Sequence, residues 1–104
     1  MEAERTTGED EAAVAGVVVD IGADIGALVV YTPEHFNGLE IEVSPADDGP
    51  RTHTIVRPRR LPHAVTHAAV FPRLAAGRYT LLGIGTIASS PVTITGGTVT
   101  EMNW

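Results

Sequence analysis

Short runs of β-branched residues, separated by turn-forming residues, are the feature that most limits what this chain can fold into. Valine, isoleucine and threonine make up 31 of the 104 residues, and these stiff side chains suit a pleated, half-buried surface. No window of a dozen residues shows the 3.6-residue period of an amphipathic helix. Glycine and proline recur between the runs, as they do in sandwiches and barrels. The pattern predicts an all-β chain.

These runs predict about seven or eight strands in an antiparallel Greek-key sandwich of the immunoglobulin-like type. The segment 39–44 is the clearest, since Ile41 and Val43 alternate with two glutamates. One face of that strand is expected to be buried and the other wet. Gly96 and Gly97 are expected to turn a final hairpin. The expected strands cover residues 13–21, 26–32, 39–44, 51–57, 64–71, 78–82, 91–95 and 98–104.

The length and the first residues predict the domain organisation. A chain of 104 residues fits one domain. Residues 1–11 are acidic and free of aromatic side chains, so we expect a disordered acidic tail before a single domain at 12–104. This start is unlike the basic start of a signal peptide, and no apolar run approaches the roughly 20 residues that cross a bilayer. We therefore expect a cytoplasmic protein without a membrane span.

Two residue types with reactive side chains are absent. Without cysteine there is no disulfide, thiolate metal site or cysteine nucleophile, and without lysine there is no Schiff base or lysine isopeptide. All seven basic residues are arginine, and alanine, glycine, valine and proline are abundant. This composition is typical of a GC-rich genome and favours an actinobacterial source.

The charges are unevenly placed along the chain. The net charge is −6, residues 13–50 hold seven acids and no base, and residues 51–78 hold six arginines and no acid. In one interpretation, strands from the two stretches pair and their charges neutralise each other. In the other, the surface is polarised and meets an anionic ligand or the acidic surface of another molecule.

The sharpest feature of the basic stretch is Arg57-Pro58-Arg59-Arg60-Leu61-Pro62-His63. We expect residues 58–63 to form the loop of a hairpin, stiffened by its two prolines. Guanidinium forks bind carboxylate and phosphate through paired hydrogen bonds. We interpret the segment as a contact site for an acidic protein or an anionic ligand; the alternative is a solvated loop whose charge maintains solubility. The residues assigned to the contact are Arg57, Arg59, Arg60 and His63.

Catalytic and metal-binding patterns are scarce. No Gly-x-Ser-x-Gly elbow surrounds a serine, and no glycine-rich dinucleotide motif is present. His53 and His67 are expected on strands that pair around the 58–63 loop, and they are weak candidates for a shared metal ion. We expect no catalytic residue, no metal and no cofactor. Nucleic acid is not an expected partner, because the chain is acidic and no aromatic residue lies among the arginines.

Residues 70–81 read Val-Phe-Pro-Arg-Leu-Ala-Ala-Gly-Arg-Tyr-Thr-Leu. This segment resembles a recurring signature of prealbumin-like β-sandwiches, the carboxypeptidase regulatory domain and the collagen-adhesin B-type repeat, in which a strand ending in Phe precedes Leu-x-x-Gly-x-Tyr. Leu74 is expected to plug the end of the sandwich, and Tyr79 to bury its ring while its hydroxyl caps a loop. Residues 92–100 resemble the final hairpin of such domains. The isopeptide of adhesin repeats needs a lysine that this chain lacks.

Function is less constrained than fold. Residues 18–33 resemble a group of small actinobacterial proteins, some of which carry a phospholipase label. The families that residues 70–81 resemble bind, brace or space other domains. We therefore expect a non-enzymatic binding or accessory module that contacts a protein partner. The alternatives are a small phospholipase-like hydrolase and a structural spacer that self-associates as a homo-oligomer.

Overall fold

The described chain folds into short strands, as its β-branched runs predict. The computed structural model describes residues 11–14 and 17–104. Apart from a 3₁₀ turn, η2 (Glu34–Phe36), every regular element in this part of the chain is a strand. The strands are β1 (Glu11–Val14), β2 (Val17–Asp20), β3 (Ile25–Thr32), β4 (Glu40–Pro45), β5 (Thr52–Ile55), β6 (Arg57–Leu61), β7 (Ala64–Ala75), β8 (Gly77–Gly83), β9 (Ser89–Ile94) and β10 (Val99–Asn103).

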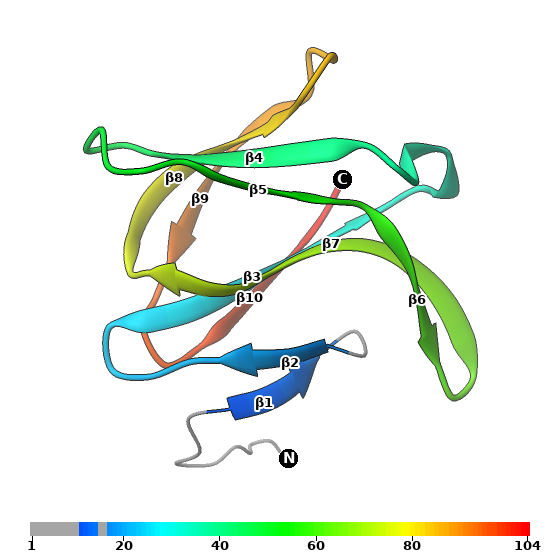
Figure 1. Ribbon diagram of the computed structural model, residues 1–104, viewed down its shortest axis with the longest axis horizontal. Coiled ribbons are helices and arrows are strands. Elements are labelled where there is room, and N and C mark those ends of the chain that lie inside the picture. The colour runs from blue at the N-terminus through cyan, green and yellow to red at the C-terminus, as the bar shows by residue number, and fades with distance from the viewer. Residues whose placement is uncertain (1–10, 15–16) are drawn as a thin grey trace.

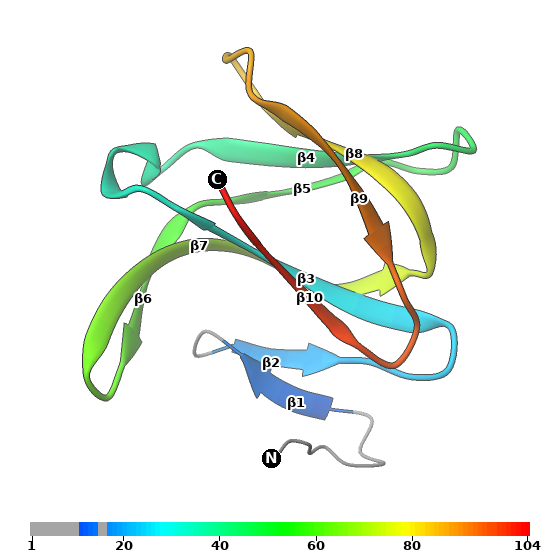
Figure 2. The same ribbon diagram turned by 180° about the vertical axis from the view of Figure 1, so that it is seen from behind.

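Eight of these strands form two four-stranded sheets (Figure 1). The first sheet has the order β10-β3-β7-β6, and the second has the order β5-β4-β8-β9. Neighbouring strands are antiparallel except β10, which runs parallel to β3; Figure 2 shows these two strands side by side. The fold is therefore an all-β, sandwich-like pair of sheets, and the first sheet is mixed where an antiparallel one was expected.

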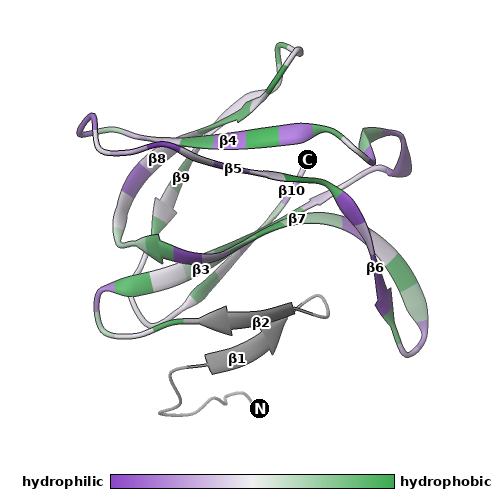
Figure 3. Cartoon of the chain, viewed as in Figure 1, coloured by the Kyte–Doolittle hydropathy of each residue, from purple (hydrophilic) through white to green (hydrophobic). Residues whose placement is uncertain are grey.

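The core lies between the two sheets and is built mainly by alternate residues of β3, β4, β7, β8 and β9. Leu28 of β3 packs in one cluster with Ile41 of β4 and Leu81 of β8, and all three side chains are fully buried. Burial of such a side chain contributes about 1.5–3 kcal/mol. In β4, Ile41 and Val43 are buried while the glutamates between them stay partly exposed, so the predicted alternation is confirmed (Figure 3).

The opposite face of the first sheet is also apolar. Ala27 and Val29 of β3 form a second buried cluster there with Ala68 and Val70 of β7. The β1–β2 hairpin covers this face, since β2 lies against both β7 and β3. The expected acidic tail, residues 1–11, lies outside the described residues except for Glu11, which begins β1.

The single strand expected at residues 51–57 is wrong, because the chain changes sheets at Val56. β5 pairs with β4 in the second sheet, whereas β6 pairs with β7 in the first. Val56 lies between them with 1% of its surface exposed, and its N–H donates to Leu39 O at 2.9 Å. Burial of this one valine draws the chain inward and separates the two strands.

The final hairpin expected at Gly96 and Gly97 is wrong as well. Both glycines turn the chain, but β9 belongs to the second sheet and β10 to the first. Gly97 has a φ of +76°, and its N–H donates to Ile25 O at 3.0 Å. A Cβ at Gly96 would collide with the backbone of Ala23. The two glycines thus let the chain pass close to the β2–β3 turn and enter the other sheet.

Candidate functional site

The arginine-rich segment is a strand, so the loop expected at residues 58–63 is wrong. β6 pairs antiparallel with the start of β7, and only Pro62 and His63 form the turn (Figure 1). Proline fixes its own φ and restricts the preceding residue to extended conformations. Two X-Pro steps in seven residues therefore favour an extended chain as readily as a loop. We call β6, with Arg57, Arg59 and Arg60, the arginine strand.

The strand register decides which arginines act together. Arg59 lies opposite Thr66 of β7, and Arg57 shares its face because it is two positions earlier. Alternate residues of a strand lie about 7 Å apart. Arg60 lies opposite Val65 and therefore occupies the other face. The structure thus brings two of the three predicted arginines together, leaves Arg60 on the opposite face and places His63 in the adjoining turn.

These arginines have no counter-charge within residues 21–104. Strand β7 carries no acidic residue, and among residues 21–104 no carboxylate forms an ion pair with Arg57, Arg59 or Arg60. The Nε of Arg59 and the Oγ1 of Thr66 are buried without a hydrogen-bond partner. Burial, and then the charge of Arg57, lowers the pKa of Arg59. The positive charge of the Arg59 guanidinium therefore has no ion-pair partner among residues 21–104.

The arginine strand is also an edge strand, since β6 ends the order of the first sheet. A partner strand that joined this edge would need backbone N–H groups of β6 as hydrogen-bond donors. Pro58 supplies none, and a proline in a sheet is tolerated where its nitrogen faces away from the ladder. The edge is therefore poorly suited to strand addition, and its arginine side chains are the groups that can bind.

Charge neutralisation between the acidic and basic stretches does occur, but at a different place. β4 comes from the acidic stretch and β5 from the basic one, and the two strands are paired. Arg51 Nη1 lies 3.5 Å from Glu42 Oε2, and His53 Nε2 lies 3.5 Å from Glu40 Oε2. Such exposed pairs contribute little to stability. The neutralisation interpretation therefore holds for Arg51 and His53, and the arginine strand takes no part in these two pairs.

The two histidines considered for a shared metal ion do not lie on paired strands. His53 is on β5, which pairs with β4, and His67 is on β7, which pairs with β3 and β6. Within the described residues, no group of three or more histidine, aspartate or glutamate side chains is placed to hold a metal ion. The expected pairing was wrong because it depended on the single strand at 51–57, which Val56 divides.

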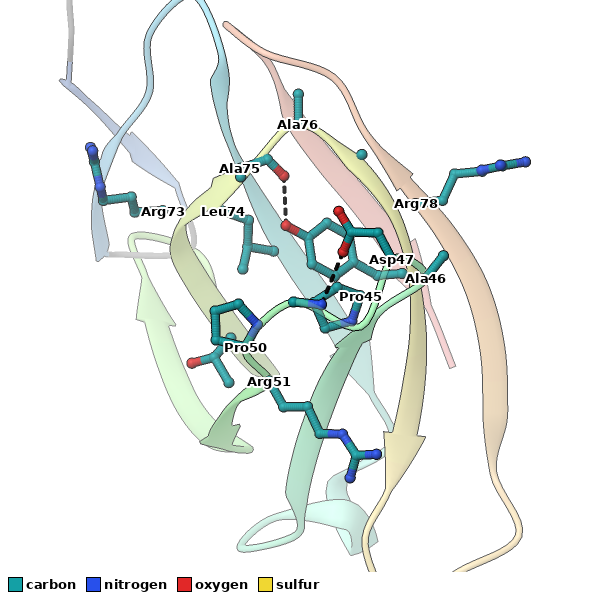
Figure 4. A pocket seen from close by; sticks show the side chains of 14 residues that line it. Pro45, Ala46, Asp47, Pro50, Arg51, Arg73, Leu74, Ala75, Ala76 and Arg78 are labelled. Carbon is teal, nitrogen blue, oxygen red and sulfur yellow. Dashed lines mark hydrogen bonds between the residues drawn. The ribbon is translucent and has the colours of Figure 1, made fainter.

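A pocket of about 500 Å³ opens where β4 ends and β8 begins. Its walls come from residues 45–47, 49–52 and 73–79 (Figure 4). Leu74 and Tyr79 are buried, and the Tyr79 hydroxyl donates to Ala75 O at 2.6 Å, so the expected burial of the tyrosine and the bond from its hydroxyl to the backbone are confirmed. Burial, and then the charge of Asp47, raises the pKa of Tyr79.

This pocket was not found from the sequence, although both of its walls carried a signal. The turn after Pro45 and the motif from Leu74 to Tyr79 are each recognisable alone. The link between them is non-local: Pro45 pairs with Tyr79 across β4 and β8, and Ala46 N–H donates to Arg78 O at 2.9 Å. Only the strand pairing shows that the two segments meet.

Comparisons with family models, curated proteins and solved structures give no match to this chain. Within residues 11–14 and 17–104, no helix is long and apolar enough to cross a membrane. The functional conclusion therefore rests on the site itself.

Proposed function

We propose that this protein is a non-enzymatic binding module whose arginine strand contacts an acidic protein or an anionic ligand. The observation that carries the proposal is the position of Arg57 and Arg59 on one face of an edge strand, with no carboxylate of residues 21–104 in an ion pair with either. His63, in the adjoining turn, adds a further hydrogen-bonding group.

The chemistry of the partner follows from the spacing of the two guanidinium groups. Each fork binds a carboxylate or phosphate through two parallel hydrogen bonds. Alternate side chains of an extended acidic peptide repeat at the same interval of about 7 Å as Arg57 and Arg59. Arg59 gains most from such a partner, because its guanidinium is partly desolvated and lies near the charge of Arg57.

We also propose that the sandwich is a Greek key of the immunoglobulin-like or prealbumin-like kind. The hydrogen bond from Tyr79 to Ala75 supports this, since a tyrosine that bonds the backbone a few residues upstream recurs in such sandwiches. Domains with this architecture host many unrelated functions, so the proposed binding role depends on the arginines and not on the fold.

The proposed contact is tested by titrating isotope-labelled protein with a hexaglutamate peptide and, separately, with inorganic phosphate. NMR shift changes are expected at residues 57–67 for at least one of these probes. The double variant Arg57→Ala/Arg59→Ala should weaken that binding about tenfold or more, because charge-assisted bonds contribute roughly 1.5–3 kcal/mol each. Binding should also weaken when the NaCl concentration rises from about 50 to 300 mM.

Arg78→Ala is the matched control, because Arg78 is an exposed arginine on β8, in the other sheet. It removes one positive charge from the surface without touching the arginine strand. Equal affinity for the double variant and the control would contradict the proposal, as would shift changes that gather away from residues 57–67. Thermal melts of all variants should agree closely, since Arg57 is exposed and Arg59 only half-buried.

A further inference from the structure

The connection between β8 and β9 projects from the sandwich and ends in apolar side chains. Residues 84–88, which we call the isoleucine loop, stand out at the top of Figure 1 and are apolar at the tip in Figure 3. Ile87 is fully exposed and Ile84 is 43% exposed. A single exposed aliphatic residue is ordinary, but two at one tip form a surface that favours burial.

The isoleucine loop is held in shape by its own hydrogen bonds. Gly83 N–H donates to Ala88 O at 3.0 Å, and Thr86 N–H donates back to Gly83 O at 3.0 Å. The Thr86 hydroxyl bonds Gly83 O at 2.8 Å and accepts from Ala88 N–H at 3.0 Å. These groups need no water, so the loop can enter an apolar site without leaving them unsatisfied.

The base of the loop is fixed by the last residue of the chain. Trp104 Nε1 donates to Ser90 Oγ at 3.0 Å, and its backbone N–H donates to Tyr31 O at 2.8 Å. A Cβ at Gly83 would meet Thr86 Oγ1 at 2.7 Å and the Trp104 ring at 3.4 Å, so the packing requires glycine there. A braced loop loses little conformational entropy on docking.

No charged residue occurs between Arg78 and Glu101. The loop therefore carries no charged side chain that would lose its hydration on docking. A membrane is a less fitting partner, because the chain is net −6 and no basic residue flanks the loop to attract anionic headgroups. An apolar recess in a protein fits the loop better.

This chain itself offers a recess with partly apolar walls at the other end of β8. The pocket described above, which we call the terminal pocket, lies beside Gly77, where β8 begins. The isoleucine loop follows Gly83, where β8 ends. A strand of seven residues spans roughly 20 Å, so the loop cannot reach the pocket of its own molecule. Leu74, Pro45 and Pro50 give the pocket apolar walls, and Asp47 and Arg51 line it as well. Figure 4 shows the side chains of Arg73 and Arg78 extending away from it on opposite sides.

We propose that the isoleucine loop of one copy docks into the terminal pocket of a second copy, so that molecules associate head to tail. The pocket, at about 500 Å³, lies within the usual size range of ligand-binding pockets. The contact is heterologous, because the two surfaces are different parts of the same chain. Repetition gives a ring if the rotation closes and a filament if it does not.

Sedimentation of the full chain from about 10 µM to 1 mM tests the proposal, because so small a contact predicts weak association. The mean mass of the wild type should rise with concentration. Ile87→Gln should weaken association about tenfold or more. Ile55→Gln is the matched control, since Ile55 is an exposed isoleucine on β5, and it should associate like the wild type.

The pocket is blocked by Ala76→Arg or, independently, by Ala46→Arg, because both alanines are exposed and line it. Each variant alone should stay monomeric. A mixture of Ile87→Gln with either pocket variant should form a dimer and nothing larger, because one intact loop and one intact pocket remain. Thermal melts verify that every variant is folded.

A wild type that stays monomeric at 1 mM would overturn the proposal, as would an Ile87→Gln variant that associates normally or a mixture that stays monomeric. Ile87-dependent binding to phosphatidylcholine vesicles by a protein that does not self-associate would assign the loop to a lipid surface instead. These outcomes are independent of the arginine strand, since Arg57→Ala/Arg59→Ala leaves both loop and pocket intact.

Discussion

Replacing Tyr79 with phenylalanine removes one hydroxyl group and leaves the buried ring in place. That hydroxyl donates to Ala75 O at 2.6 Å, a short bond that joins the end of β7 to the start of β8. The ring belongs to the core cluster and is 9% exposed. The substitution therefore isolates the hydrogen bond from the packing of the side chain.

The expected loss of unfolding free energy is about 1 kcal/mol. A typical hydrogen bond in a protein contributes 0.5–1.5 kcal/mol net, and a buried acceptor left without a partner costs about 1–3 kcal/mol. Ala75 is exposed, so water can replace the lost donor, and the smaller figure applies. For a domain of this size, about 1 kcal/mol corresponds to a fall of roughly 5 °C in Tm.

Tyr31→Phe is the matched control. The Tyr31 hydroxyl donates to Glu101 Oε2 at 3.1 Å, in an exposed position. Its removal should cost less than about 0.5 kcal/mol, because solvent competes for both groups. Urea unfolding and calorimetry measure both variants. Equal losses for the two tyrosines, or a Tyr79→Phe variant as stable as the wild type, would refute the role given to this bond.

Three further predictions follow from contacts and pKa shifts. Gly26→Ala should cost about 2 kcal/mol, because the new Cβ would lie 2.6 Å from Thr95 O and 2.7 Å from Ile94 Cγ2. Gly22→Ala, which has no atom within 4 Å of its Cβ, should change stability in the same urea titration by less than about 0.5 kcal/mol. Stability should fall in alkali: burial raises the pKa of Tyr79 and Tyr31 in the folded state, so the unfolded chain loses those protons first. The stability that the two protonated tyrosines contribute is fully present below about pH 10, the pKa of an unfolded tyrosine. It is lost as the pH rises through their pKa in the folded state. Tyr79→Phe should flatten the decline in Tm between pH 9 and about 11.5, and an unchanged slope would contradict the assignment.

The features that were predicted correctly are those with a local cause. The alternation in β4 follows from the pleat, which places Ile41 and Val43 on one face and the glutamates on the other. The role of Tyr79 is local too, because the bonded carbonyl of Ala75 is only four residues upstream of Tyr79. A pattern confined to a few residues constrains the same few residues in the structure.

The errors concern which strands pair. Residues 51–57 look like one strand, yet the burial of Val56 divides them between two sheets, and burial depends on the whole core. The strand expected to end at residue 71 continues to Ala75, because β3 pairs with it as far as Ile25. Long-range pairing sets both outcomes, and no local pattern records it.

The residues of the arginine strand were identified from the sequence, but their arrangement as a strand was not predicted. Charge and two prolines favour a loop when the segment is considered alone. Pairing with β7 converts it into a strand and places Arg57 and Arg59 on one face, with Arg60 on the other. The terminal pocket was missed for the same reason, since its two walls are joined only by the pairing of β4 with β8.

The arginine strand and the isoleucine loop should respond to sodium sulfate in opposite ways. Sulfate screens the charges of Arg57 and Arg59 and competes for their guanidinium groups, so binding of hexaglutamate should weaken as its concentration rises. The same salt is excluded from protein surfaces and strengthens apolar burial, so docking of Ile87 should tighten. Titration of one sample, with shift changes followed at residues 57–67 and mass followed by sedimentation, measures both effects. If association falls with sulfate in parallel with peptide binding, then a single electrostatic contact accounts for both, and the head-to-tail contact through Ile87 is wrong.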